Sequence, residues 1–438
     1  MRTRNMWLIA GLAVALVAGC CGVLAKESGT GRGGGGAEKT PVAEPLTFQW
    51  GESTLLSDDG NRAARTAQRG FSIATDGDRV HAIYQSVISR ENGEVYYRRS
   101  DDGGLTWGTP QRLTHHEGRA MAPNIAVKGD DVYCVWRDTR FDQDGELYFI
   151  RSTDGGDSWE GAVRLTEDDV RTAAPNMAVV GDSVTITWED YGMANKRSDV
   201  EILRSADAGR SWKPRQSVIE AVNGCPILAV GEGDVLNLVS CSWDHSKPTE
   251  GYNFELYFRR SEDGGASWTA PRRLTDDETG DSRFPVIAAS GRTLHVAWWD
   301  DRDDDRYPHR GYPPISPPAD HNFEVYYKRS DDMGETWSED TRLTNSVSVA
   351  SNPAIVSKGS RVFIVWEDNR DGGNAIFFKY STDDGLTWSE DIRLTDPAHE
   401  GIVPGLAVGD DGALHLIWTE KRDGPPRAYV MRGLPSGG

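Results

Sequence analysis

The octapeptide pattern Ser-x-Asp-x-Gly-x-Ser/Thr-Trp occurs six times in this chain of 438 residues, and this repetition limits the possible folds more than any other feature. The copies begin at Ser100, Ser152, Ser205, Ser261, Ser330 and Ser381. Successive copies start 51 to 56 residues apart, except for one interval of 69 residues. A nearly constant period of this length indicates a repeat architecture.

The residues around each octapeptide have the pattern of β-strands. Residues 94–99, 146–151 and 324–329 precede three of the copies, and they alternate as a half-buried strand does. An Arg-Leu-Thr triplet follows five of the copies, beginning at Arg112, Arg164, Arg273, Arg342 and Arg393. We therefore expect each octapeptide to be the loop of a β-hairpin.

The repeated side chains of the octapeptide are suited to stabilising a turn. The carboxylate can accept backbone N–H groups of its own turn, the glycine permits a backbone conformation closed to other residues, and the tryptophan can bury a large ring. The carboxylates are Asp102, Asp154, Asp207, Asp263, Asp332 and Asp383. Each loop offers too few oxygens for calcium, and no His/Cys spacing suits zinc, so we expect neither a metal nor a cofactor.

This octapeptide is the Asp box, and through it the chain resembles the sialidase-type BNR-repeat propellers. The resemblance implies an all-β propeller of four-stranded blades, with the Asp boxes on the face opposite the active one. A Gly/Asp turn followed by an apolar strand occurs seven times, so we predict seven blades; the six blades of known sialidases are the alternative. These segments span residues 78–84, 130–136, 182–188, 234–243, 292–298, 360–366 and 411–418.

The seventh repeat lacks its last strand at the C-terminal end. Residues 50–57 match the pattern of residues 107–114, which follow the first Asp box. We therefore expect the N-terminal strand to complete the last blade and close the ring, which removes open sheet edges.

The N-terminus has the pattern of an export signal. Arg2 and Arg4 precede an apolar run over residues 7–18 that is short for a membrane span. Val17-Ala18-Gly19-Cys20 resembles the bacterial lipobox, in which Cys20 is the lipid attachment point. We expect a lipoprotein signal peptide over residues 1–25, a flexible tether over 26–45 and one propeller domain over 46–438. An ordinary secretory cleavage site is the alternative. Because Cys21 is not Asp, the resemblance implies the outer membrane.

Charge and cysteine content limit the partners. A net charge of −20 argues against nucleic acid, which requires clustered Lys and Arg, and we expect a monomer. Cys134 and Cys241 lie in apolar strands and are expected to be buried core residues. A disulfide between Cys225 and Cys241 is allowed by an oxidising compartment but is not required.

The loops before the first strands and between the second and third strands should meet at one mouth of the propeller. The pattern Trp-x-Asp/Glu-x-Arg occurs there four times, beginning at Trp136, Trp298, Trp366 and Trp418. One interpretation is a polar funnel for an acidic sugar, and the other is a repeated Asp–Arg pair that orders each loop.

Sialidases use three arginines, a tyrosine activated by a glutamate, and an aspartate acid/base. The family's Arg-Ile/Leu-Pro motif is absent here, and no Tyr–Glu pair can be assigned. Arginines do stand near the beginning of four first strands, which suggests repetition instead of a unique clamp. They are Arg69, Arg119, Arg171 and Arg283.

The repeat symmetry breaks most strongly at an insertion over residues 303–320. We predict a site centred there, with Arg283, Arg302, Arg306 and Arg310 as ligand-binding residues. In an enzymatic version, Tyr307 or Tyr312 is the candidate nucleophile and Asp300 a candidate catalytic carboxylate. The alternative is that these arginines only neutralise the aspartates around them.

Two functions follow from this reading. The first is an envelope propeller that binds a glycan, or an envelope or extracellular protein, at its funnel. The second is an exo-α-sialidase-type glycoside hydrolase that releases terminal acidic sugars. The Asp boxes favour neither, because a fold does not determine a function.

Overall fold

The computed structural model describes residues 46–58, 63–65, 72–89, 92–141, 143–168, 170–192, 197–222, 224–243, 254–276, 280–304, 322–346, 348–422 and 424–436. The predicted signal peptide, Cys20 and the tether lie outside these residues. Within them, no helix has the length and apolar character that a membrane crossing requires. Besides strands, the described residues contain two short 3-10 helices, η2 (Glu232–Asp234) and η3 (Pro397–His399).

The described residues form seven antiparallel sheets, which we call blades 1 to 7 in chain order. Blade 1 contains β3 (Ala63–Arg65), β4 (Ile73–Asp76), β5 (Arg79–Val87), β6 (Gly93–Ser100) and β7 (Gln111–Arg112). Blade 2 contains β8 (Ala120–Lys128), β9 (Asp131–Asp138), β10 (Glu146–Ser152) and β11 (Val163–Arg164). Blade 3 contains β12 (Arg171–Val180), β13 (Ser183–Gly192), β14 (Arg197–Ser205) and β15 (Gln216–Val222).

The remaining four blades repeat this order. Blade 4 contains β16 (Ile227–Val230), β17 (Leu236–Trp243), β18 (Phe254–Ser261) and β19 (Arg272–Arg273). Blade 5 contains β20 (Ser282–Ser290), β21 (Thr293–Asp300), β22 (Glu324–Ser330) and β23 (Thr341–Arg342). Blade 6 contains β24 (Ala350–Lys358), β25 (Arg361–Asp368), β26 (Ala375–Ser381) and β27 (Ile392–Arg393). Blade 7 contains β28 (Ile402–Val408), β29 (Leu414–Glu420), β30 (Arg427–Ser436), β1 (Thr47–Trp50) and β2 (Thr54–Leu55).

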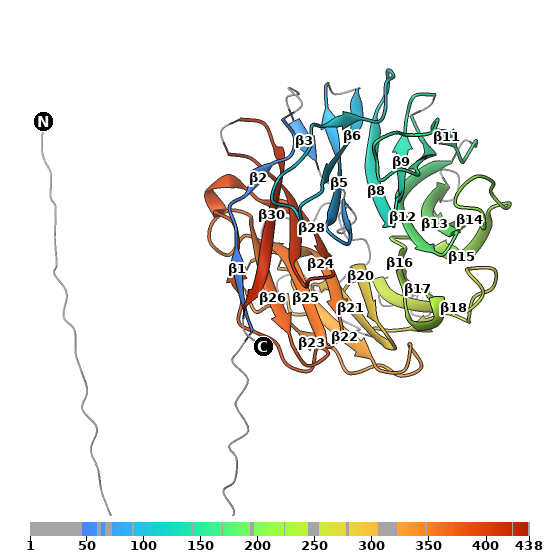
Figure 1. The fold of residues 1–438 in the computed structure, drawn as a ribbon. Coiled ribbons are helices and arrows are strands. Elements are labelled where there is room, and N and C mark those ends of the chain that lie inside the picture. Colours follow the sequence, from blue (N-terminus) through green and yellow to red (C-terminus); the bar gives the residue numbers. More distant parts are fainter. Residues whose placement is uncertain are drawn as a thin grey trace, which may run out of the picture. The chain divides into compact units, whose positions relative to one another are not determined.

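The first strands of the blades form the inner wall of a closed ring (Figure 1). Each first strand contacts the first strand of the next blade, and β28 contacts β4, which closes the circle. The prediction of a seven-bladed propeller is confirmed, and the six-bladed alternative is wrong.

The N-terminal strand closes the ring, as predicted. β1 pairs antiparallel with β30, from Thr47 opposite Ser436 to Trp50 opposite Gly433. β2 pairs with the same strand farther along, and the seventh blade is therefore made from both ends of the chain. In blade 7 the outer-strand position beside β30 is therefore occupied by β1 and β2.

Each Asp box is a turn whose polar side chains form hydrogen bonds within the turn itself. In blade 2, Asp154 accepts hydrogen bonds from the Ser152 hydroxyl at 2.6 Å and from the Ser158 backbone N–H at 2.9 Å. These hydrogen bonds, that of Ser152 first, hold the pKa of Asp154 well below its usual range. The Ser152 hydroxyl oxygen also accepts the Gly156 N–H at 2.8 Å. The same contacts recur in the other five boxes.

The tryptophan of each box packs onto the blade before its own. The Trp159 ring meets Tyr97 of blade 1 edge-on, with a centroid distance of 5.0 Å. Gly156 has a φ of +92°, and a Cβ there would lie 2.2 Å from the Tyr97 hydroxyl oxygen. The glycine is therefore required both by its own turn and by the neighbouring ring. Three further junctions show the same edge-on pair, Phe149–Trp212, Phe258–Trp337 and Tyr327–Trp388.

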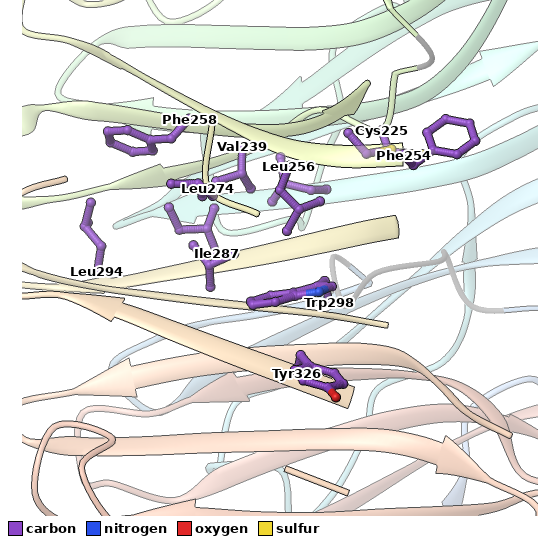
Figure 2. Close-up of a cluster of buried hydrophobic side chains, with 13 residues drawn as sticks. Cys225, Val239, Phe254, Leu256, Phe258, Leu274, Ile287, Leu294, Trp298 and Tyr326 are labelled. Carbon is purple, nitrogen blue, oxygen red and sulfur yellow. The ribbon is translucent and has the colours of Figure 1, made fainter. Parts of the chain in front are cut away.

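The hydrophobic core is divided among the junctions between blades. The junction of blades 4 and 5 illustrates it, with Leu256, Leu274 and Ile287 in the middle of the cluster, Phe258 at one end and Trp298 on the blade-5 side (Figure 2). Cys134 and Cys241 are buried, as expected. Among the described residues, Cys225 and Cys241 form no disulfide with each other.

We expect the chain to depend on its N-terminal strand for stability. A chain that begins at residue 60 lacks β1 and β2, including Trp50, so blade 7 keeps three strands and an open edge. The loss should be at least the roughly 3–5 kcal/mol that removal of a packed tryptophan costs, seen as early melting or aggregation. A chain that begins at residue 45 is the control and should melt as the full chain does. Equal melting of the two truncated chains would contradict the closure.

Buried histidines make the stability of the ring sensitive to acid. His81 and His295 occupy equivalent positions on second strands, and each ring Nδ1 lies 2.7 Å from the hydroxyl of Tyr97 or Tyr327. Burial lowers the pKa of both His81 and His295 to about 3, with smaller effects of nearby Arg79, Arg99 and Asp101 on His81 and of Arg329 on His295. Their Nε2 atoms have no partner among the described residues.

We therefore expect a matched substitution to flatten the pH dependence of stability. The pKa of the unfolded histidine is about 6.5, so the contribution of His295 is complete above pH 6.5 and is lost as the pH falls toward about 3. His295→Phe copies Phe363, the equivalent residue of blade 6. Its free energy of unfolding should fall less steeply between pH 6.5 and 4, by up to about 1.4 kcal/mol per pH unit. Parallel curves in denaturant titrations would refute the assignment.

Candidate functional site

The mouth of the propeller carries one symmetric set of residues. In blade 5, Asp300 accepts the indole N–H of Trp298 at 2.8 Å and an Nη–H of Arg302 at 2.7 Å. The Arg302 guanidinium lies over the Tyr326 ring, 4.5 Å from its centroid. Equivalent acids receive the same two donors in blades 2, 6 and 7, namely Asp138, Asp368 and Glu420. The Asp–Arg pairs order the loops of the mouth, which is the second of the two interpretations above.

Blade 3 keeps this arrangement with a different arginine. Gly192 stands where the other blades have the arginine. Arg215, from the segment before β15, pairs instead with Asp190 at 3.2 Å and with Asp168. Burial raises the pKa of Asp190 to about 7, because one half-exposed arginine shared with Asp168 compensates burial incompletely.

A second set of mouth residues is not symmetric. The residue between the tryptophan and the acid varies among the blades, with glutamate in two of them, and the strand register identifies the equivalent residue in blades 1 and 4, which lack that tryptophan and acid. In blade order they are Gln85, Arg137, Glu189, Cys241, Trp299, Glu367 and Thr419. A site that recognises one asymmetric ligand is itself asymmetric, so the variable residues are the candidates for such a site.

The facing first strands carry a repeated bulge. The residue before each of six prolines has a positive φ although it is not glycine, a conformation that is strained for such residues. In blade order these residues are Ala122, Ala174, Cys225, Phe284, Asn352 and Val403. In five of these strands the pairing register shifts at the same place. Because of the bulge, the residue just before the positive-φ residue of the first strand lies opposite the variable residue of the second strand.

Blade 5 combines the two variable positions into one cluster, Arg283, Phe284 and Trp299, which we call the blade-5 platform. Arg283 is opposite Trp299 in the register, and the Phe284 and Trp299 rings stack with a centroid distance of 4.8 Å. The Arg283 guanidinium lies 4.2 Å from the centroid of the Phe254 ring and pairs with Asp281 at 2.5 Å. All three platform side chains are half-buried.

Two donors of the platform are unsatisfied. The Nε–H of Arg283 and the indole N–H of Trp299 are buried, and neither has an acceptor among the described residues. A buried donor without an acceptor costs about 1–3 kcal/mol. A ligand that brings oxygens to the platform would recover this free energy.

The register changes the interpretation of the mouth arginines. Arg119 and Arg171 precede Ala120 and Thr172, which lie opposite the acids Asp138 and Asp190. Arg283 instead follows the residue opposite the acid, and its equivalents are Met121, Ala173, Ser351 and Ile402. The expectation that Arg283 repeats Arg119 and Arg171 is therefore wrong. Arg283 stands two residues before its proline, whereas Arg119 and Arg171 stand four residues before theirs. Arg69 lies outside the described residues.

The structure places three of the predicted site residues. Asp300 is buried within the symmetric set, and Arg302 pairs with both Asp300 and Asp340, the latter at 2.8 Å. Arg283 belongs to the blade-5 platform. Arg306, Tyr307, Arg310 and Tyr312 lie outside the described residues, so their roles stay predictions, as do those of Asp300, Arg283 and Arg302 in binding or catalysis.

Glu367, the variable residue of blade 6, was not predicted as a site residue from the sequence. Its carboxylate accepts the Asn352 side-chain N–H at 2.6 Å, the Ser351 hydroxyl at 3.0 Å and the Val403 backbone N–H of blade 7 at 2.8 Å. Burial raises the pKa of Glu367 above its ordinary value, against the effect of these donors. In the sequence it is hidden inside the repeated Trp-x-Asp pattern, and only the register could have identified it.

Comparison with known proteins identifies the family. The BNR repeat-like domain matches residues 46–219 and 182–398. The chain belongs to this family. The predicted relationship to sialidase-like Asp-box propellers is thereby confirmed. No curated protein sequence matches this member significantly. Among the described residues, no cluster of three His, Cys, Asp or Glu side chains is arranged to hold a metal ion.

Solved structures share the fold at low sequence identity. An ulvan lyase of polysaccharide lyase family PL25 is 12% identical, with a TM-score of 0.61, covering 84% of this chain and 95% of that one. Its complex with the glycan -[GlcA(1-4)Rha3S]- matches over the same shares with a TM-score of 0.59. A protein of unknown function from Dyadobacter fermentans is 13% identical with a TM-score of 0.54, covering 88% of this chain and 98% of that one.

Proposed function

We propose that this member of the BNR repeat-like family is an envelope propeller that binds a carboxylated glycan at its mouth, centred on the blade-5 platform. The observation that carries the proposal is the pair of unsatisfied donors, Arg283 Nε–H and Trp299 Nε1–H, beside two stacked aromatic rings. Unpartnered arginine Nε atoms beside stacked rings also occur at Arg140 and Arg370, but those arginines belong to the symmetric set, whereas the platform has its donors at the variable positions.

Each part of the platform suits one part of such a ligand. Arginine pairs with carboxylates through parallel N–H donors, and these charge-assisted hydrogen bonds are stronger than neutral ones. Arg283 is held in place by Phe254 and by Asp281, which is itself fixed by the Phe254 backbone N–H at 2.8 Å. The rings of Phe284 and Trp299 offer apolar faces to a sugar ring, and the Trp299 N–H offers a donor to a hydroxyl.

The structural comparisons support a glycan as the ligand class. The ulvan lyase has the same fold over most of both chains, and one of its structures holds a glucuronate-containing glycan. At 12% identity this likeness supports the fold, and the ligand is inferred from the platform.

A hydrolytic activity of exo-α-sialidase type is the second candidate, and Glu367 favours it. Its raised pKa and its position at the mouth, one blade beyond the platform, suit a general acid. Binding remains the first proposal because the arginines of the symmetric set are committed to their own acids.

The test is binding of a glucuronate-containing oligosaccharide, compared with the same oligosaccharide after reduction of its carboxyl groups. Loss of one charge-assisted interaction is worth about 1.5–3 kcal/mol, so Arg283→Ala should bind the charged glycan about 10- to 100-fold more weakly in calorimetry. Its affinity for the reduced glycan should change little. Trp299→Ala should weaken both.

Met121→Ala, at the position of blade 2 equivalent to Arg283, is the matched control and should bind as the wild type does. Equal affinity of the wild type and Arg283→Ala for the charged glycan would refute the proposal. The glycan should be recovered uncut, and release of a terminal acidic sugar would establish the hydrolase instead.

The envelope location is part of the proposal and rests on the lipobox-like sequence at Cys20. The full-length chain expressed in a Gram-negative host should fractionate with the outer membrane and incorporate labelled fatty acid. Cys20→Ser removes the thiol that accepts the lipid and should abolish the label. Equal labelling of both proteins would contradict the anchor.

A further inference from the structure

The N-terminal segment joins the propeller on the face opposite the mouth, which we call the Asp-box face. Third strands run from the mouth to the Asp boxes, and Gly433 of β30 occupies the position of the Asp-box serine. β30 continues past this position to Ser436, and Thr47 lies opposite Ser436. β1 therefore enters the ring at the Asp-box face, and the segment that carries Cys20 joins the propeller there.

This entry point lies between the Asp boxes of blades 6 and 1. The hydroxyl of Tyr380, which stands just before the serine of the blade-6 box, donates to the Leu46 carbonyl. On the other side, a Cβ at Gly103 of the blade-1 box would lie 3.4 Å from an Nη atom of Arg432 on β30. The Asp-box pattern does not recur in blade 7. The boxes of its two neighbours therefore flank the start of β1 and the end of β30.

The two flanking boxes share a residue that the other four boxes lack. The sixth position of the octapeptide is Leu105 in blade 1 and Leu386 in blade 6, and these residues are 66% and 67% exposed. At the same position the boxes of blades 2 to 5 carry Asp157, Arg210, Ala266 and Glu335. A large apolar side chain at this position is thus confined to the two blades beside the entry point.

A third exposed leucine lies in blade 7 itself. Leu434 is 40% exposed and stands one residue past the Asp-box position of β30. Single exposed apolar residues are common on protein surfaces, but these three lie on one face, in three consecutive blades, around the entry point of β1. We call Leu105, Leu386 and Leu434 the entry patch. Large apolar residues that are exposed elsewhere in the described chain lie at the mouth or on outer strands, namely Ile88, Phe141, Leu55 and Val163.

We propose that the entry patch rests on the lipid surface in which Cys20 is anchored, so that the Asp-box face meets the membrane and the mouth faces away from it. This inference rests on the lipid anchor of the proposed function. Residues 21–45 separate Cys20 from Leu46, a length that spans at most about 90 Å when fully extended. The tether therefore limits the distance from the membrane, and the patch gives the blade-5 platform its orientation toward ligands outside the membrane.

The anchor makes a weak contact sufficient. Three leucines contribute too little to bind a free protein to a membrane, but a tether holds the ring near the surface at an effective concentration on the order of millimolar. Each exposed leucine that leaves water favours the contact by about tenfold. A net charge of −20 opposes contact with anionic lipids, so the surface that fits is zwitterionic.

The test is hydrogen–deuterium exchange of the lipidated protein on phosphatidylcholine vesicles. The chain that begins at residue 45, mixed with the same vesicles, is the unanchored reference. Amides around Leu105 and Leu386 should exchange more slowly in the anchored protein, whereas the boxes of blades 3 and 4, across the ring, and the mouth should exchange as in the reference.

Two failures can be told apart. A protein that floats with the vesicles but shows no added protection at the boxes of blades 1 and 6, or equal protection at those of blades 3 and 4, would overturn the inference and leave the anchor intact. A protein that does not float lacks the anchor, and the inference fails with it. Neither result bears on glycan binding at the blade-5 platform, which is measured separately.

A double variant connects the protection to the patch. Leu105→Asp and Leu386→Glu copy the residues at this position in blades 2 and 5, so the turns should tolerate them. The double variant should stay lipidated and lose the added protection. Phe141→Asp makes the same change at an exposed site of the mouth, copies Asp371 of blade 6 and should keep the protection. Protection that survives in a double variant with the melting temperature of the wild type would overturn the proposal.

A second copy of the chain is the competing occupant of the entry patch. If the patch joined two copies, the chain that begins at residue 45 would form a dimer in analytical ultracentrifugation, and the same chain with Leu105→Asp and Leu386→Glu would not. A dimer that the double substitution abolishes would overturn the assignment to a membrane. A monomer in both cases is the result that the proposal predicts.

Discussion

The contact on which the ring depends is a tryptophan of one blade packed against the third strand of the blade before it. Four junctions show this as an edge-on aromatic pair, and two more place Trp107 and Trp268 in clusters that contain Val430 and Ile202 at the same position. The seventh junction uses Trp50 of the N-terminal strand, whose ring meets Phe378 at 5.3 Å. Seven equivalent contacts explain why the six Asp boxes need a seventh tryptophan from the other end of the chain.

This repeated framework leaves only certain positions able to vary. In five blades the acid at the end of the second strand binds its own tryptophan and an arginine. Blade 3 keeps this arrangement although its usual arginine is absent, because Arg215 pairs with Asp190 instead. Two neighbouring positions are free of this constraint. One is the variable residue just before the acid, and the other is the residue of the bulged first strand that lies opposite the variable residue. Substitutions at these positions can therefore change what the mouth binds without disturbing the contacts that close the ring. Arg283, Phe284 and Trp299 occupy such positions in blade 5.

The sequence predicted the fold well because the fold is periodic. The spacing of the Asp boxes indicated the repeat, the seven turn-and-strand segments predicted the number of blades, and the match of residues 50–57 to residues 107–114 predicted the closure. The site could be predicted less well because it depends on register. A bulge before Pro285 determines that Arg283 lies opposite Trp299, and without this pairing Arg283 was grouped with Arg119 although the two differ in their distance from the proline. Glu367 was missed for the same reason, since its neighbours in the structure come from Asn352 and from the next blade at Val403.

The central claim is that recognition occurs where the mouth departs from its own symmetry. Hydrogen–deuterium exchange of the full chain, with and without a saturating glucuronate oligosaccharide, tests it most directly. The account predicts added protection in peptides that cover β20 and the end of β21 in blade 5, and unchanged exchange in the equivalent peptides of blade 3. Protection spread equally over all blades, or confined to blades other than 5, would contradict it.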